Sequence, residues 1–419
     1  MSRAFTILAR RFGPFEKAVR IFWDQLKKAR GLDLELELVP LDLPELHAAI
    51  LTKRFDVAHV NTDWLAECWA RGCLEDLSAR ARADPPEEYP QGWPQSLLGL
   101  QTFPDGLAGI PFHDGPECLI YRKDLFHSER ERHDYRARYS TELAPPRTWT
   151  EFARIAAFFN RPEKGMYGTL FALYPDGHNN VFDFALQVLS RGGSLEKEGR
   201  VVLDSPEALD ALGDYRILIN SPFIHPESRQ LESIGACWTF ARGEVAMMVN
   251  WFGFATMCET VEGSRVSGCV DICAIPHADS HPDPVSLNVY YVWSISPDSH
   301  HKDLAYEYIK NGVRRENDIT LTMEGGIGCR RSTWSDPRVK RAIPYYDRME
   351  EIHGYARTLP RTAAWHPISM VIDQMVIDTI DTDRPVAGIL REAQARVDAI
   401  AGTGERPASG LRATPGTSP

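Results

Sequence analysis

The sequence predicts an α/β protein with two lobes. The chain has 419 residues, which is longer than a domain with a single hydrophobic core usually is, so we expect two domains. Apolar strand-like runs alternate with amphipathic runs over residues 4–60, which is typical of a parallel sheet with helical crossovers. Residues 105–126, DGLAGIPFHDGPECLIYRKDLF, hold two further strand-like runs separated by a polar break. With no helix between these runs, the segment suits a chain that passes from one lobe to the other.

The first part of the chain predicts a sheet whose strand ends carry polar residues. Prolines at positions 14 and 44 fit the first turns of two helices, and leucines that alternate with glutamates predict a strand with one solvated face. Ligands in such sheets bind beyond the carboxyl ends of the strands, here residues 10–12 and 61–64. The predicted elements are strands at 4–9, 34–38 and 55–60, with helices at 13–26 and 44–50.

Later elements are identified by their caps and by their periodicity. Thr148 and Glu151 have the spacing of a capping box, and Ser205 precedes Pro206 as a helix cap. Residues 127–147 are charged and predict a surface excursion, whereas 402–419 lack core residues and predict a disordered tail. The remaining predictions are a strand at 270–275, a loop at 277–288, a strand at 289–296, a helix at 301–313 and helical structure over 367–400.

Composition excludes several classes of protein. A net charge of −11 argues against a nucleic-acid partner. The sequence contains no run of 18 apolar residues, so it predicts no membrane-spanning helix. The start, MSRAFTILARRF, has no apolar signal core. The protein is therefore either cytoplasmic, or its signal peptide was removed or never included. The 8 cysteines lie mostly in apolar contexts, which predicts mostly free thiols; a Cys68–Cys73 pair is an alternative.

The sequence predicts neither a metal site nor catalysis. Cys269, Cys273, His277 and His281 recur every four residues, but Pro276 would break a helix there. In a strand the two cysteines lie about 13 Å apart, so they cannot share one zinc ion. No Walker A sequence, G-x-S-x-G elbow or HExxH motif occurs. We therefore expect no cofactor, no catalytic residue and no enzymatic activity.

Stretches spread over residues 4–400 resemble type 1 extracellular solute-binding proteins of ABC importers. FDVAHVNTDWLAE resembles the family's strand and ligand loop, and PPRTWTEF resembles "P-P-x-T-W-D-E". Each motif is weak alone, but their shared order makes the resemblance specific. The matching stretches are residues 55–67, 75–77, 105–126, 145–152, 238–248 and 291–309.

The resemblance implies a two-lobed, periplasmic-binding-protein-like fold. Each lobe would be a mostly parallel sheet flanked by helices. Three crossings, near 112–115, 275–288 and 325–330, would join the lobes. The N-terminal lobe would comprise 1–112 and 277–327, and the C-terminal lobe 113–276 and 328–401. Ligand would bind in the cleft between them, and the lobes would close on it by hinge motion.

Candidate ligand-binding residues lie at the strand ends and crossings. Sugars need aromatic faces against their C–H surfaces and charged or amide groups for their hydroxyls. A tryptophan at the position of Trp251 commonly stacks on sugar in the family. Helix capping, hinge hydrogen bonding and core packing are the alternative roles for these side chains. The candidates are Arg11, Phe12, Asn61, Asp63, Trp64, His113, Asp114, Glu117, Tyr174, His178, Asn250, Trp251, Tyr290, Tyr291, Gly326, Arg330 and Trp365.

The resemblance implies a solute-binding component of an ABC importer. Its ligand would be a carbohydrate, a polyol or a sugar acid, and its partners would be permease subunits in the membrane. We expect a monomer that acts in the periplasm or tethered outside the membrane. A sugar-modifying enzyme with two α/β lobes and a ligand sensor that signals through a receptor are the alternatives.

Overall fold

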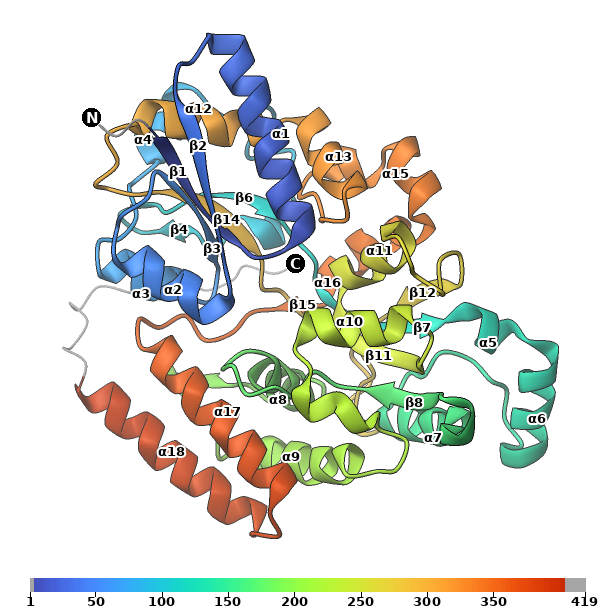
Figure 1. Cartoon of the computed structure of the whole chain (residues 1–419). Coiled ribbons are helices and arrows are strands. Elements are labelled where there is room, and N and C mark those ends of the chain that lie inside the picture. Colours follow the sequence, from blue (N-terminus) through green and yellow to red (C-terminus); the bar gives the residue numbers. More distant parts are fainter. Residues whose placement is uncertain (1–3, 404–419) are drawn as a thin grey trace, which may run out of the picture.

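Two sheets flanked by helices form the two lobes of the protein (Figure 1). The computed structural model describes residues 4–403. The N-terminal lobe occupies the upper part of Figure 1, and the C-terminal lobe lies below it with the two last helices. The predicted two-lobed α/β fold is thus confirmed.

The first sheet has the strand order β2-β1-β3-β14-β6. Strands β1, β2 and β3 pair in parallel, while β14 runs antiparallel to both β3 and β6. Phe112 and Trp293 stack at 4.4 Å within its core. The strands are β1 (Ala4–Arg10), β2 (Glu35–Leu41), β3 (Val57–Asn61), β6 (Ile110–His113) and β14 (Tyr291–Ile295); the helices are α1 (Gly13–Arg30), α2 (Leu43–Leu51), α3 (Leu65–Ala70), α4 (Ser78–Ala83), α12 (Lys302–Gly312) and α13 (Arg315–Met323).

The second sheet has the order β12-β7-β11-β8. Here β7 is antiparallel to β12 and β11, while β11 and β8 are parallel. Its strands are β7 (Glu117–Arg122), β8 (Tyr167–Leu170), β11 (Val245–Trp251) and β12 (Val270–Cys273); its helices are α5 (Lys123–His127), α6 (Glu129–Tyr139), α7 (Trp149–Phe159), α8 (Asn179–Leu189), α9 (Pro206–Ile219), α10 (Ser233–Ala241), α11 (Phe252–Thr260), α17 (Trp365–Asp381) and α18 (Val386–Thr403).

Each sheet contains one strand that runs against the others, and in each case it is the strand that enters from the other lobe. Strand β7 follows the first crossing, and β14 follows the second. A strand that enters at the cleft edge must run away from the cleft, whereas strands fed by crossover helices end there. The prediction of mostly parallel sheets holds for all strands except these two.

Three passages of chain join the lobes, and they are tied to one another. The first is the short turn from β6 to β7. The second, between β12 and β14, contains β13 (Ser286–Leu287), which pairs with β15 (Ala356–Arg357) of the third passage. The Ser286 hydroxyl also donates to the Glu117 carbonyl at 2.6 Å. The third passage, from α13 to α17, is much longer than the 325–330 crossing that the sequence predicted.

Residues 328–354 contact both lobes. They form α14 (Arg331–Trp334) and α15 (Pro337–Ala342), which contact α13 of the first lobe, and α16 (Met349–Gly354), which lies nearer to α11 in Figure 1. Tyr346 contacts Phe252 of α11 with ring centroids 5.1 Å apart, and Arg348 bonds to Asp271 of β12 at 3.2 Å. The sequence assigned 328–354 wholly to the C-terminal lobe, whereas this segment contacts both lobes.

Helix α6 replaces most of the excursion predicted at 127–147. Ser128 caps it by accepting from the Glu131 N–H. Glutamates in the first turn and arginines in the last suit the helix dipole, and Tyr135 is the residue that α6 buries. Because only one residue of α6 is buried, apolar periodicity gave no signal for this helix.

The predicted helix caps are present. Thr148 Oγ accepts from the Glu151 N–H, while the Glu151 carboxylate accepts from the Arg147 N–H rather than from that of Thr148. Ser205 accepts from the Ala208 N–H at the start of α9. Both helices therefore begin where the sequence places them.

All 8 cysteines are free. No cluster of metal-ligating side chains occurs within residues 4–403, a range that includes Cys269 and Cys273. The same part of the chain contains no helix long and apolar enough to cross a membrane. Most of the tail predicted to be disordered, residues 404–419, lies outside the described residues.

Candidate functional site

A cavity of about 110 Å³ lies between the lobes. It is larger than the space that one water needs, so it can hold a small organic ligand. The lining is drawn from both lobes and is mainly apolar with a few polar groups. Its residues are Arg10, Phe12, Phe15, Leu43, Asn61, His113, Asp114, Gly115, Asp176, His178, Asn179, Phe182, Glu232, Ser233, Ile234, Trp251, Gly253, Phe254, Val289 and Tyr291.

Adjacent strand ends of the first sheet supply the polar wall of the cavity. Strand register sets Tyr291 of β14 opposite Asn61 of β3 and opposite His113 of β6. Arg10 ends β1 on the same edge. Burial raises the pKa of Tyr291 to about 12, so its hydroxyl stays protonated. This row can therefore offer a hydroxyl, an amide and an imidazole to a ligand.

His113 and Asp114 at the first crossing are held by the third passage. His113 Nδ1 accepts from the Ile327 N–H at 3.0 Å, which leaves the ring proton on Nε2. Burial lowers the pKa of His113 to about 4, so the ring is neutral. Asp114 Oδ2 lies 2.6 Å from His353 Nε2 of α16, while its Oδ1 has no partner. The two residues join the cavity to the hinge.

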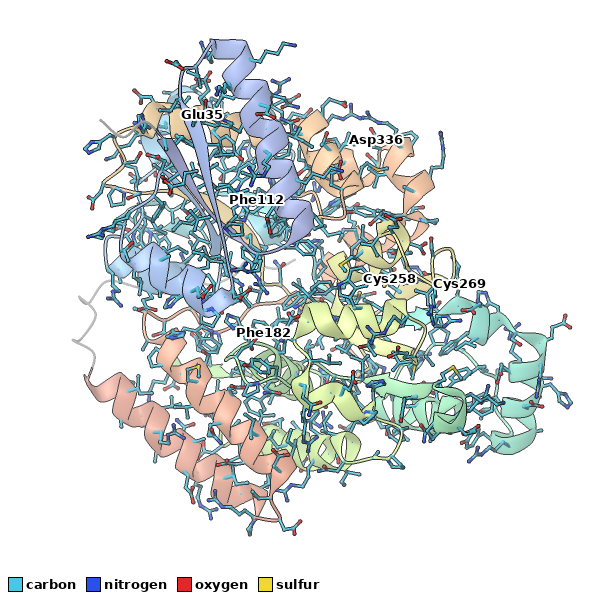
Figure 2. All side chains as sticks on the ribbon, in the orientation of Figure 1. Glu35, Phe112, Phe182, Cys258, Cys269 and Asp336 are labelled. Carbon is cyan, nitrogen blue, oxygen red and sulfur yellow. The ribbon has the colours of Figure 1, made fainter. Side chains whose placement is uncertain are left out.

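Aromatic rings of the second lobe also line the cavity. Trp251 ends β11, and Phe182 on α8 meets it edge to face with centroids 5.2 Å apart. Phe182 lies on the side of its lobe that faces the other lobe (Figure 2). Phe254 of α11 approaches Phe12 of the first lobe at 6.3 Å. Together these rings offer flat apolar surfaces to a ligand.

Helix α10 brings its N-terminus to the cavity. Glu232 caps it by accepting from the Ile234 and Gly235 N–H groups. Asn250 fixes this corner, because its amide donates to the Ser233 carbonyl while its oxygen accepts from the Trp251 N–H. Asn250 is therefore a positioning residue for Trp251.

The lobes touch each other around the cavity. Arg10 lies 3.9 Å from Glu232 across the cleft. His178, which precedes α8, lies 3.8 Å from Asp63 of the first lobe. Beyond them, the rings of His47 on α2 and His366 on α17 are 4.4 Å apart. These contacts depend on how closely the lobes approach, so they mark the closing surface of the cleft.

Several predicted site residues line the cavity and others lie near it. Arg11 is turned outward and bonds to Asp42, whereas its neighbour Arg10 faces the cleft. Asp63 lines a separate, smaller cavity, and Tyr174 is 49% exposed on the surface. The predicted residues that line the main cavity are Phe12, Asn61, His113, Asp114, His178, Trp251 and Tyr291.

Other predicted residues have structural contacts away from the cavity. The Arg330 guanidinium is fully buried and donates to the carbonyls of Glu87 and Val313 and to the Glu88 carboxylate. The Tyr290 hydroxyl donates to Gln101 at 2.6 Å. The remaining ones are Trp64, packed between His47 and His178; Glu117, buried at the start of β7; Trp365, in the core of α17; and Gly326, against Leu321.

Some residues that line the cavity carry no specific signal in the sequence. Glu232 is visible in the sequence only as an acid before a helix, which indicates a cap. Phe182 and Phe254 occupy apolar helical positions, which usually indicate core. Arg10, Asp176 and Asn179 are close in sequence to predicted site residues. Only the direction in which each side chain points from its strand or loop decides which of them lines the cavity.

A model of the bacterial extracellular solute-binding protein family matches residues 22–318. The chain belongs to this family. The match covers the first two crossings and every strand of both sheets except β1. No curated protein sequence matches the chain significantly.

Solved structures of solute-binding proteins share the fold. The maltose-bound MalE3 of T. maritima is 21% identical with a TM-score of 0.81, covering 95% of this chain and 99% of that one. A ribitol-bound protein of Agrobacterium radiobacter is 22% identical with a TM-score of 0.83, covering 95% and 98%. A D-mannitol-bound protein of Agrobacterium vitis is 17% identical with a TM-score of 0.81, covering 97% and 100%.

Proposed function

We propose that this solute-binding protein captures a small carbohydrate or polyol between its lobes and delivers it to the membrane permease of an ABC importer. The observation that carries the proposal is the cavity itself. Both lobes supply hydrogen-bonding groups and aromatic rings to its lining. A sugar has hydroxyl edges and apolar C–H faces, and this arrangement matches both.

The proposed mechanism is hinge closure on the ligand without chemical change. A ligand that touches Asn61 and Trp251 together would stabilise the approach of the two lobes. The Asp114–His353 contact connects the first passage between the lobes to the third, which would let the two passages bend together. We propose that the protein works as a monomer outside the cytoplasmic membrane, in the periplasm or tethered to the surface.

The relatives of known structure support this ligand class. Those quoted above carry maltose, ribitol and D-mannitol, which are a disaccharide and two polyols. The small cavity of this chain favours a ligand of one sugar unit over a long oligosaccharide. Sugar recovered unchanged after long incubation would agree with binding alone.

A thermal-shift screen tests the proposed function. The purified protein would be heated with monosaccharides, disaccharides and polyols, with free amino acids as the non-sugar control. A ligand at one hundred times its Kd stabilises the folded state by about 2.7 kcal/mol, which raises the melting temperature by several degrees. The proposal fails if no sugar or polyol raises the melting temperature.

Acid is expected to weaken binding of a sugar found in that screen. The pKa values of His47 and His366 are lowered from 6.5, mainly by burial between the lobes. Opening exposes both rings, so the open form binds more protons as pH falls through 6.5, and acid favours opening. Two groups act in the opposite direction. Glu67 raises the pKa of His47, and burial raises the pKa of Asp63 to about 6, so Asp63 takes up a proton on closure and acid favours closure through this residue.

His366→Phe separates these contributions, because phenylalanine keeps the ring contact and removes the charge. We expect the fall in affinity between pH 7.5 and 5.5 to be shallower in this variant, as measured by calorimetry. His133→Phe, on the exposed surface of α6, is the matched control. Identical pH profiles for His366→Phe and the unmodified protein would exclude this pair as the cause.

A further inference from the structure

The positive charge that lines the cavity is already in contact with carboxylates. Arg10 is the only arginine or lysine that lines it within the described residues. Its guanidinium donates to Asp42 at 3.0 Å and lies 3.9 Å from Glu232. A ligand that carries a carboxylate would have to compete with these two acids for the same guanidinium.

Negative charge exceeds positive charge in the lining. Asp114, Asp176 and Glu232 line the cavity against the single guanidinium of Arg10. The Asp176 carboxylate accepts from the His178 backbone N–H and lies 3.8 Å from His178 Nδ1, and Glu232 accepts from backbone N–H groups at the start of α10. None of these bonds removes the charge of the carboxylate. The cavity thus has an electrostatic potential that favours a cation.

Two buried oxygens of lining residues have no hydrogen-bond partner. They are Asp114 Oδ1 and Asn61 Oδ1, and the two residues are only 1% and 5% exposed. Asp114 is held in place through its other oxygen by His353, so it cannot turn away. Buried acceptors without partners are costly. A ligand that brings hydrogen-bond donors to this wall would remove that cost.

The aromatic wall suits a cation as well as a sugar face. Trp251 and Phe182 line the cavity together with Asp114, and Phe254 lies 6.3 Å from Phe12 in the same lining. The faces of such rings attract ammonium groups, and tryptophan does so most strongly. Aromatic rings and carboxylates together make a better site for an amine than for a neutral hydroxyl.

We infer that the ligand is an amino sugar or amino polyol, whose ammonium group binds at Asp114 and whose ring lies against Trp251. The inference rests on the proposed function and narrows its ligand class. It excludes the sugar acids that the sequence had left among the expected ligands. Hydroxyls of the same ligand would serve Asn61 and the Nε2–H of His113.

Calorimetry with matched sugars tests the inference. The probes are D-glucose, D-glucosamine, N-acetyl-D-glucosamine and D-glucuronate, with the corresponding galactose and mannose sets. We expect the best amine to bind at least about tenfold more tightly than its parent sugar near neutral pH. The N-acetyl form, which keeps the nitrogen but not the charge, should bind no better than the parent, and the acid should not bind.

Two variants assign the preference to the cavity. Asp114→Asn keeps the size of the side chain and an oxygen for His353, and it should reduce the amine preference to less than about threefold. Asp176→Asn removes a second lining charge and should also reduce it, so the test survives if the first variant fails to fold. Asp298→Asn makes the same charge change on an exposed surface loop and should leave the preference intact.

The outcomes separate the inference from the proposed function. Neutral sugars that bind as tightly as their amines would overturn the inference and leave sugar capture standing. Tight binding of a uronate would also overturn it. A preference for amines that survives both lining variants would refute the assigned site. If no probe of any charge binds, sugar capture itself fails, and the inference fails with it.

Discussion

Replacing Trp251 with alanine is expected to weaken sugar binding at least tenfold. Trp251 ends β11 at the cavity and is braced by the edge of Phe182 at 5.2 Å. Its ring offers the largest flat surface in the lining. A tenfold loss corresponds to about 1.4 kcal/mol, which is within the range for aromatic stacking. Calorimetry with the best ligand from the screen measures the effect.

Trp238→Ala is the matched control for this substitution. Trp238 lies on α10, is 37% exposed and does not line the cavity. It should leave the Kd unchanged. The affinity of Trp251→Phe for the sugar should lie between those of the alanine variant and the unmodified protein, because phenylalanine keeps a smaller ring. If Trp251→Ala folds normally and binds with unchanged affinity, the ring does not contact the ligand.

Replacing Arg330 with methionine is expected to lower the free energy of unfolding by about 3–5 kcal/mol. The guanidinium donates to two carbonyls and to Glu88 Oε2, and it lies 4.9 Å from the Trp93 ring. Methionine fills much of the volume but leaves the carbonyls of Glu87 and Val313 without this donor. Urea unfolding measures the loss, and the protein that remains folded should bind ligand normally.

The neighbouring Arg331 is the control for Arg330. Its side chain is 53% exposed, and its nearest acid, Glu350, is 3.9 Å away. Arg331→Met should change stability by less than about 0.5 kcal/mol. A stable Arg330→Met variant with weak ligand binding would support the ligand-binding role that was predicted for Arg330 from the sequence.

Motif order and strand ends predicted part of the candidate site. Asn61, His113 and Trp251 were identified because each ends a strand at the expected edge. Position along a strand is a local property, so the sequence shows it. The same reasoning chose Arg11 over Arg10, because the side on which a terminal residue points depends on strand pairing. Arg10 pairs with Leu41 in the sheet, and Arg11 follows it into solvent.

Other predicted site residues have buried polar contacts that the sequence does not show. Tyr290 and Arg330 looked like ligand contacts because polar side chains near a crossing commonly serve that purpose. In the structure Tyr290 bonds to Gln101, and Arg330 bonds to the Glu87 carbonyl. These partners lie about 190 and 240 positions away along the chain, so no local pattern predicts them.

The sequence by itself determined the family, the two-lobed architecture and the strand ends that meet at the cleft. Those features follow from local periodicity, caps and the order of motifs. Only the tertiary structure decided which polar groups remain unpaired at the cavity. Asp114 keeps one oxygen without a partner because His353 holds the other, and Asp42 and Glu232 engage Arg10. The charge of a site is set by pairing in space, and pairing in space is fixed only when the lobes come together.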